Sequence, residues 1–450
     1  MTDNDLIQES PGAARVVSRS DVLVVGGGPS GLSAALAARR MGASVTLVER
    51  YPYLGGLASG GMVLVLDDMH NGDEVTVTGA CMEMIERMAK LDLCMYPPVE
   101  ERGASEALYR KWARWGAFDF RSQMKPPPIV MAAAFDPDGW KRVANEMIAE
   151  AGVNLRLHSW FSKAVVQDGR IRGVICETKE GRQALMAETV IDTTGDLDVA
   201  AAAGAAFSDG SYIVTTVFRL GGVDTEEAER FERESPEEWA KLDRAAKRLM
   251  GGSWDKWWLK TPLPGVVWCN CPHMIGLDGI KVADQTKADF EGRKRIYALL
   301  DYARASMPGF RNCFVVDVAP QLGVRQTRLL QGEYVVTKDD VMDRVHFQDT
   351  VARGRDYYTP YRSMLPKEVE GLVVAGRHYS ATEAAQKMSR EIPPCMSMGH
   401  AAGVAAALSA QSGTPLRHID PAQICKHVRA QGGDPGDRPS ANATFLEKAA

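Results

Sequence analysis

The chain has 450 residues, a length that suggests two or three domain-sized units. Hydrophobic residues make up 45% and charged residues 25%, which is ordinary for a globular protein with large buried cores. The formal net charge of −5 argues against nucleic-acid binding, because such proteins need a basic surface for the phosphates.

Residues 1–20 contain neither a basic start nor an apolar run, and no stretch approaches the ~18 uninterrupted apolar residues of a membrane helix. Eight cysteines are scattered along the chain without the rhythm of a disulfide scaffold, which is typical of reduced thiols. We therefore expect a cytoplasmic protein without membrane insertion.

The first structured segment reads as a β-α-β unit. Residues 21–25 (DVLVV) predict a buried parallel strand, and residues 44–48 (SVTLV) predict a second one. Between them, an Ala- and Leu-rich segment after GGGPSG predicts a helix that stops at Gly42. The whole unit takes about thirty residues, as expected for this motif.

The turn between the first strand and the helix carries the pattern Gly26-x-Gly28-x-x-Gly31. Such glycines allow a tight turn and the close approach of a pyrophosphate to the positive end of the helix. Glu49 stands at the end of the second strand, where a carboxylate meets a ribose hydroxyl. A glycine-rich turn alone is a weak signal, but this context favours a dinucleotide site.

The next elements alternate between helix and strand. Residues 138–152 predict a helix and residues 153–157 a strand. Residues 161–188 predict a small β-meander with turns at Asp-Gly and Glu-Gly pairs. Residues 189–192 (TVID) predict a further apolar strand that ends at TTGD.

The second half contains two charged helices, one near residues 225–234 and one that begins after Ser235. For the latter, Ser235 and Glu238 have the spacing of a capping box. A longer helix, a strand and a Gly- and Ala-rich helix are predicted at residues 286–306, 372–375 and 396–410.

Apolar strands with glycine turns fall in three separated blocks. The fold class expected is therefore α/β, with a Rossmann-type domain assembled from three blocks, a small β-meander and an inserted α+β cap domain. The nucleotide-binding blocks are 20–62, 130–210 and 365–425, the cap is 63–129 and 211–364, and 1–19 and 431–450 are flexible ends.

Several motifs resemble those of FAD-dependent oxidoreductases. They are Glu49-Arg50 with YPYLGGLASGG, IDTTGD at 191–196, LVVAGR at 372–377, and the segments 323–340 and 390–403. The resemblance covers most of residues 20–412 and includes the flavoproteins related to succinate dehydrogenase and fumarate reductase, with their glutathione-reductase-like FAD-binding fold. It implies that FAD is the cofactor.

The cofactor-binding residues expected from the fingerprint and from this resemblance are Gly26, Gly28, Pro29, Ser30, Gly31, Glu49, Arg50, Gly56, Leu57, Ala58, Phe161, Thr194, Gly195, Asp196, Gly376, Arg377, Met398 and Gly399. The loop at 51–61 has no histidine where succinate-dehydrogenase relatives attach flavin, so the FAD should be non-covalent. No Cys-x-x-Cys pair and no second dinucleotide fingerprint occur.

Arg390 is the first candidate for substrate contact, because the resemblance puts it where an arginine grips a substrate carboxylate. An ion pair with Glu391 is the alternative. Arg325 either contacts the substrate or supports the flavin or the interdomain seam. His400 lies inside the expected flavin helix, and His273 is a candidate acid or base in the cap. Cys269, Cys271 and His273 lack a metal-binding spacing, so no metal site is expected.

The favoured function is an FAD-dependent dehydrogenase, oxidase or reductase that moves a hydride between a small organic substrate and flavin N5. Without an NAD(P)H domain, electrons go to oxygen, a quinone, an electron-transfer protein or a second substrate. A flavin-dependent monooxygenase or hydroxylase and a non-catalytic dinucleotide-binding scaffold are the alternatives, and a homo-oligomer stays open. The tryptophan-rich cap either lines the pocket or only packs.

Overall fold

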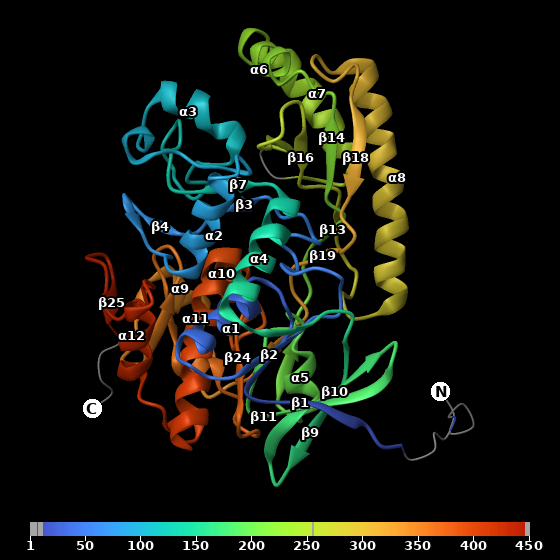
Figure 1. Ribbon diagram of the computed structural model, residues 1–450. Helices are drawn as coiled ribbons and strands as arrows, with labels where there is room; N and C mark the ends of the chain where they lie inside the picture. The colour runs from blue at the N-terminus through green and yellow to red at the C-terminus, as the bar shows by residue number, and fades with distance from the viewer. Residues whose placement is uncertain (1–6, 8–11, 254–255, 446–450) are drawn as a thin grey trace.

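The protein has a mixed α/β fold built on a parallel sheet. The computed structural model describes residues 7, 12–253 and 256–445 (Figure 1). Five strands run parallel in the order β8, β2, β1, β11, β24. Their bounds are β1 Arg15–Val25, β2 Val45–Val48, β8 Asn154–Arg156, β11 Gly181–Asp192 and β24 Leu372–Val374.

Strand β11 pairs with β1 on one edge and has two successive partners on the other edge. Its first half pairs antiparallel with β10 (Arg170–Thr178), which in turn pairs with β9 (Trp160–Gln167). Its last residues pair parallel with β24. The last strand of the expected meander and the expected strand at residues 189–192 are therefore one continuous strand, β11. The TTGD turn follows at its end.

Helices α1 (Pro29–Arg40) and α11 (Ile392–Ser412) cross at close range. A Cβ on Gly399 would lie 2.1 Å from the carbonyl oxygen of Ser30, and one on Gly403 would lie 2.2 Å from that of Ala34. Only glycine fits at such distances, and the two glycines are one helical turn apart, on the same face. The backbones of α1 and α11 therefore touch.

Helix α11 is longer than the sequence predicts, because it begins at Ile392 instead of Met396. Proline is accepted in the first turn of a helix, where its missing N–H would have no partner. Pro393 and Pro394 therefore open this helix, and Gly413 closes it in a left-handed conformation with φ of 72°.

A second hydrophobic core lies in the unit at the upper right of Figure 1. Its sheet has the order β15, β16, β14, β18, and three helices pack on it. The buried Trp257 and Trp258 both contact Phe310, so these two tryptophans belong to the core. Trp254 lies outside the described residues. The bounds are β14 Phe218–Gly221, α6 Thr225–Glu234, α7 Pro236–Leu249, β15 Trp258–Lys260, β16 Val267–Cys269, α8 Val282–Ser306 and β18 Phe314–Val318.

The predicted capping box before α7 is wrong. Ser235 is the N-cap residue of α7, but its side chain accepts no capping hydrogen bond. In contrast, the Asp136 side chain accepts from the backbone N–H of Gly139 and caps α4 (Pro137–Ala151). The Ser235 backbone already ends α6, which leaves it with φ and ψ of −133° and 59°.

The main core extends into segments expected in the cap. Residues of α2 (Ala80–Ala89) and β22 (Thr350–Arg353) pack in the same cluster as α1 and α11, and β22 pairs with β23 (Tyr358–Pro360). The chain ends also differ from the expectation. Strand β1 includes residues 15–19, and β25 (Thr444–Phe445) pairs with β21 (Val345–His346). Residues 1–6, 8–11 and 446–450 of the expected flexible ends lie outside the described residues.

Short elements complete the chain. They are β3 Val65–Leu66, β4 His70–Asn71, β5 Glu74–Val75, β6 Cys94–Met95, α3 Glu106–Trp112, β7 Ala133–Phe135, α5 Asp198–Ala202, β12 Phe207–Asp209, β13 Val214–Thr215, β17 His273–Met274, β19 Gly323–Val324, β20 Arg328–Leu330, α9 Lys338–Met342, α10 Glu383–Ser389 and α12 Pro421–Ala430. Among the helices of the described residues, none is both long and apolar enough to span a bilayer.

The crossing of α1 and α11 generates a stability prediction. Gly399→Ala puts a methyl group into the Ser30 carbonyl, so the helices must separate, and we expect a loss of about 1–3 kcal/mol in the free energy of unfolding. Denaturant unfolding of the apoprotein measures it. Gly12→Ala is the matched control, because a Cβ there meets nothing within 4 Å. Equal stability of both variants would contradict the close crossing.

Candidate cofactor and substrate site

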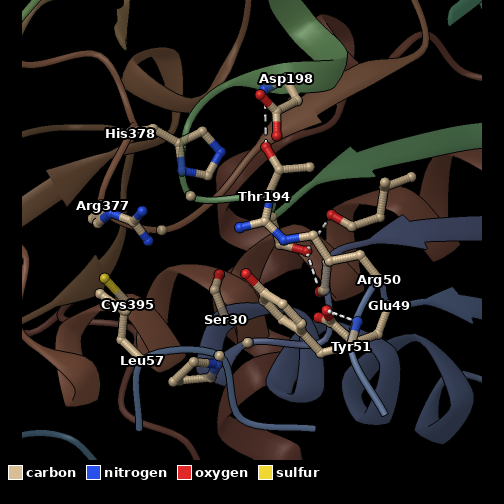
Figure 2. A pocket seen from close by; sticks show the side chains of 18 of the residues that line it. Ser30, Glu49, Arg50, Tyr51, Leu57, Thr194, Asp198, Arg377, His378 and Cys395 are labelled. Carbon is tan, nitrogen blue, oxygen red and sulfur yellow. Dashed lines mark hydrogen bonds between the residues drawn. The ribbon is translucent and has the colours of Figure 1, made fainter. Parts of the chain in front are cut away.

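A cleft of about 950 Å³ opens at the carboxyl ends of β1, β2 and β11, between α1 and α11 (Figure 2). Fourteen predicted residues line it: Gly26, Gly28, Pro29, Ser30, Glu49, Arg50, Gly56, Leu57, Phe161, Thr194, Gly195, Gly376, Arg377 and Arg390.

The glycine turn brings backbone to the cleft. Gly26 has φ of 106°, a conformation that side chains rarely adopt, and a Cβ on Gly31 would lie 1.8 Å from the Gly26 carbonyl oxygen. Gly31 is therefore required for the turn itself and does not line the cleft. The turn leads into the first residues of α1, whose unpaired N–H groups make this end of the helix positive.

Glu49 is held in place by two backbone groups. Its carboxylate accepts hydrogen bonds from the N–H of Gly27 at 2.7 Å and of Tyr51 at 2.9 Å. Burial raises the pKa of Glu49, and the backbone hydrogen bonds oppose this effect. Beside it, the Arg50 guanidinium lies 4.9 Å from the centre of the Tyr51 ring and 5.4 Å from that of Trp160. This end of the cleft therefore combines a fixed carboxylate with aromatic surface.

Asp192 organises the turn after β11. It is fully buried and accepts from the N–H and hydroxyl of Thr194 at 3.0 and 2.7 Å and from the N–H of Ala200 at 2.8 Å. Nearby, Arg377 donates to Asp196 at 2.9 Å, and a Cβ on Gly195 would lie 2.1 Å from that guanidinium. Asp196 therefore does not line the cleft itself, but holds the Arg377 side chain, which does.

The polar atoms around the cleft fit FAD. Within the described part of the chain, Ser30 Oγ, Arg377 Nε, His378 Nδ1 and Arg390 Nε are buried without a hydrogen-bond partner. Buried polar atoms are normally paired, so four such atoms around one cleft indicate a polar ligand. The diphosphate and ribityl hydroxyls of FAD supply suitable partners.

The structure does not bring every predicted cofactor residue to the cleft. Ala58 and Met398 are buried away from its lining, and Gly399 serves the helix crossing. His400 also lies elsewhere, with its Nε2 3.0 Å from Gln431 Oε1 and its ring against Gly79 and Gly433. His400 is five residues after Cys395, which lines the cleft, so it lies on a different face of α11 and does not line the cleft.

Arg325 and His273 meet next to Arg390. Arg325 Nη2 lies 3.4 Å from His273 Nε2 and 3.2 Å from Asn270 Oδ1. Because a guanidinium can only donate, Nε2 of His273 accepts. Burial and the charge of Arg325 lower the pKa of His273 to about 4, and burial together with the charge of Arg390 lowers that of Arg325 to about 10. Arg390 itself lies 3.3 Å from Glu391.

Two aspartates adjoin this cluster. Asp68 accepts from the Tyr357 hydroxyl at 2.6 Å and pairs with Arg121 at 3.3 Å. Burial raises the pKa of Asp68 to about 6. Burial and the charges of Glu391 and Asp68 raise the pKa of Asp67 well above its usual value. The sequence held no signal for this pair, because two acidic residues after a two-residue strand are ordinary in a surface loop.

Other cleft residues that the sequence analysis missed are Val25, Val48, Tyr51, Ser159, Trp160, Thr193, Asp198, Gln321, His378, Ile392 and Cys395. Most of them are neighbours of predicted residues, so extending each motif by one or two positions would have found them. Among the described residues, no group of three or more His, Cys, Asp or Glu side chains could hold a metal ion.

Comparison with known proteins finds several solved structures to which the chain is similar. Solved structures of similar fold include a geranylgeranyl bacteriochlorophyll reductase-like protein from Thermoplasma acidophilum, with 14% identity, coverage of 92% of this chain and 83% of the other, and a TM-score of 0.45. An L-amino acid deaminase from Proteus vulgaris has 14% identity, coverages of 93% and 95% and a TM-score of 0.46. The p-nitrophenol 4-monooxygenase of Pseudomonas putida DLL-E4 has 14% identity, coverage of 92% of this chain and 85% of the other, and a TM-score of 0.46.

Such low identities and scores carry no information about the reaction, and no curated protein matches the chain significantly. The family model described as "FAD dependent oxidoreductase" matches residues 21–357 and 353–429, which is most of the chain. The protein therefore belongs to the FAD dependent oxidoreductase family, and FAD is its cofactor.

Proposed function

We propose that the protein oxidises or reduces a small organic acid by hydride transfer to or from FAD. The proposal rests on one observation: Arg390 lines the α11 end of the cleft, and Arg325, which contacts His273 behind the lining, is near enough for the charge of Arg390 to act on it. It includes the inference that the parallel sheet forms a Rossmann-type FAD-binding domain from three blocks of the chain, with the α6–α8 unit as its cap.

Two guanidinium groups close together create a site for an anion. The lowered pKa of Arg325 reflects the nearby charge of Arg390, and a carboxylate placed between them would relieve this repulsion. Arginine also binds carboxylates through two parallel hydrogen bonds, which fixes the orientation of the substrate. The ion pair with Glu391 leaves Arg390 Nε without a partner, so Arg390 keeps a donor for the substrate.

His273 is assigned a positioning role. Its Nε2 accepts from Arg325, and the low pKa keeps the ring neutral at physiological pH, so the acceptor is always present. His273 therefore holds Arg325 in place for the substrate, instead of acting as the acid or base expected from the sequence.

Asp67 is the better candidate for proton transfer. FAD, when bound, takes up or releases a hydride at N5, so a substrate oxidised at a C–H bond must also lose an O–H or N–H proton. Arg390 and Glu391 both act on the pKa of Asp67, which places its carboxyl near the anion site. A carboxyl with a raised pKa keeps its proton to a higher pH than an ordinary carboxyl and can therefore act as an acid.

Electrons leave to oxygen, a quinone, an electron-transfer protein or a second substrate, and the FAD is held without a covalent bond. The chain offers no second dinucleotide fingerprint for NAD(P)H and no histidine in the loop at 51–61.

Arg390→Ala tests the anion site. A panel of small carboxylic acids is mixed anaerobically with the FAD-loaded protein, and bleaching of the flavin identifies a substrate. For that substrate we expect kcat/KM to fall about 10- to 100-fold in Arg390→Ala, because one charge-assisted hydrogen bond is lost.

The exposed Arg311 in the cap provides the matched control, and Arg311→Ala should retain the wild-type rate. Unchanged turnover in Arg390→Ala would refute the assigned role. If no acid bleaches the flavin, but an externally reduced protein hydroxylates an aromatic compound with oxygen, the protein is a monooxygenase instead.

Asp67→Asn tests the proton step. The amide cannot exchange the proton, so we expect the rate of flavin reduction at saturating substrate to fall about 10²- to 10⁴-fold while substrate affinity changes little. Stopped-flow reduction over pH 5–9 measures both, and Asp301→Asn, at an exposed position of α8, is the control. A wild-type reduction rate in Asp67→Asn would exclude Asp67 as acid or base.

The buried Asp68 generates a pH prediction. Its pKa of about 6 in the folded protein exceeds the value of an unfolded chain, so the folded state binds this proton more tightly. The resulting stabilisation is complete below about pH 4 and is lost as the pH rises through about 6. The melting temperature of the wild type, relative to Asp68→Asn, should therefore fall by a few degrees between these pH values. Asp301→Asn should show no such trend.

A further inference from the structure

Two buried glutamines lie next to the arginines of the proposed substrate site and take part in none of the steps above. Gln386 belongs to α10 and is 0% exposed, and Gln326, the residue after Arg325, is 3% exposed. Burying an amide is costly unless its polar atoms form hydrogen bonds. The partners of these two side chains therefore show which parts of the chain the amides hold together.

The Gln386 amide joins two segments that carry arginines. Its Nε2 donates to the backbone oxygen of Arg325 at 3.0 Å and to that of Arg377 at 2.9 Å. Both oxygens can only accept, so these partners fix the orientation of the amide. Arg377 lines the cleft at the turn after β24, whereas Arg325 follows β19 in the small sheet that also contains His273. One amide therefore connects the cleft wall with the neighbouring sheet.

Gln326 strengthens this connection from the other side. Its Nε2 donates to Gln386 Oε1 at 2.7 Å and to the backbone oxygen of Glu383 at 3.1 Å. Together with the bond from Gln386 to Arg325, these bonds attach the Arg325–Gln326 segment to α10, whose C-terminal cap residue is Arg390. The amide pair therefore fixes the backbone of Arg325 relative to the helix that ends at Arg390.

The two arginines that the pair holds are like charges. Burial and the charge of Arg390 lower the pKa of Arg325 to about 10, so the two guanidinium groups act on each other. Their repulsion tends to move the two segments apart. A neutral amide pair opposes this movement without adding a charge. A carboxylate in place of either amide would instead attract an arginine and compete with an anionic substrate.

We infer that Gln326 and Gln386 form a positioning pair, which keeps Arg325 and Arg390 at the spacing that holds one carboxylate of the substrate. Neither glutamine lines the cleft, so the pair acts through the two arginines. Hydrogen bonds from arginine are directional, and a change of spacing therefore weakens the binding of the carboxylate. This inference rests on the proposed function, because that proposal supplies the anionic substrate.

Gln386→Met tests the pair, because methionine is unbranched like glutamine but lacks the amide. For the acid that bleaches the flavin, we expect KM to rise about 10-fold while kcat stays within about twofold. Gln411→Met is the matched control. The exposed Gln411 also donates from Nε2 to a backbone oxygen, that of Met41 at 2.9 Å, and its variant should keep both constants.

The second member of the pair is tested by Gln326→Met and by the double variant. Residues that act as one unit are not additive, so the double variant should raise KM about as much as Gln386→Met alone. A KM increase equal to the product of the two single effects would show that the glutamines act separately, which overturns the pair. If Gln386→Met does not fold, Gln326→Met carries the measurement, with a smaller increase expected because Gln386 keeps both of its backbone partners.

Binding of an unreactive anion separates this inference from the reaction. Benzoate has no C–H bond beside its carboxylate that could supply a hydride, and benzamide has nearly the same shape without the charge. The change in flavin absorbance on titration gives the dissociation constant of each for the FAD-loaded protein. We expect Gln386→Met to bind benzoate about 10-fold more weakly than the wild type does, with equal binding of benzamide.

Each result decides the assignment. Unchanged KM and benzoate affinity in Gln386→Met would overturn the positioning role. So would lower kcat and FAD affinity at an unchanged KM, which would indicate only a general loss of structure. If no acid bleaches the flavin but Gln386→Met still weakens benzoate binding, the hydride-transfer proposal fails and the positioning pair stands. If the wild type binds benzoate no more tightly than benzamide, the anion site is absent and the pair is refuted with it.

Discussion

The contact between α1 and α11 determines where the reactive parts of this protein meet. Because Gly399 and Gly403 let the two helix backbones touch, the first turn of α1 and the first turn of α11 open onto one cleft. One end supplies the glycine turn for a diphosphate, and the other supplies Ile392 and Cys395 beside Arg390. A side chain larger than hydrogen at either glycine would separate these two walls. A single steric constraint therefore sets the distance between the glycine turn and the wall that carries Arg390.

Strand β11 has a similar role for the sheet. It pairs with β1 along most of its length, closes the meander in its first half and receives β24 at its end. Its last residue, Asp192, then binds Thr194, Ala200 and His378. Charges buried this deeply are stabilised only by complete hydrogen bonding, so the turn has little freedom to move. The TTGD motif therefore serves mainly to hold the cleft wall in one position, and less as a set of separate ligand contacts.

The sequence was most informative where local physics decides the structure. The β-α-β unit, α6 and the strand at 372–374 follow from periodicity and glycine turns, and the Gly26–Gly31 turn follows from its fingerprint. Predictions from sequence were wrong where the position of a side chain depends on contacts between distant segments of the chain. Residues 396–402, around Gly399, have the composition of either a flavin-binding helix start or a packed helix. Only the crossing with α1 shows that Gly399 packs against the backbone of Ser30. The direction of the His400 side chain depends on the same crossing, and no local sequence pattern predicts that crossing. Burial raises the pKa of both Asp67 and Asp68, with a smaller contribution from the charge of Glu391, and no local sequence pattern predicts this burial.

The charged groups around the cleft are arranged in order along its length. At one end, the Glu49 carboxylate is fixed by backbone N–H groups. The glycine turn and the positive first turn of α1 come next. At the α11 end, the partly buried Arg390 lines the cleft, and burial together with its charge lowers the pKa of Arg325. Under the proposed function, FAD would take the position at the glycine turn and an acid the position at Arg390. Because the two ligands would contact different groups, cofactor binding and turnover can be separated by experiment.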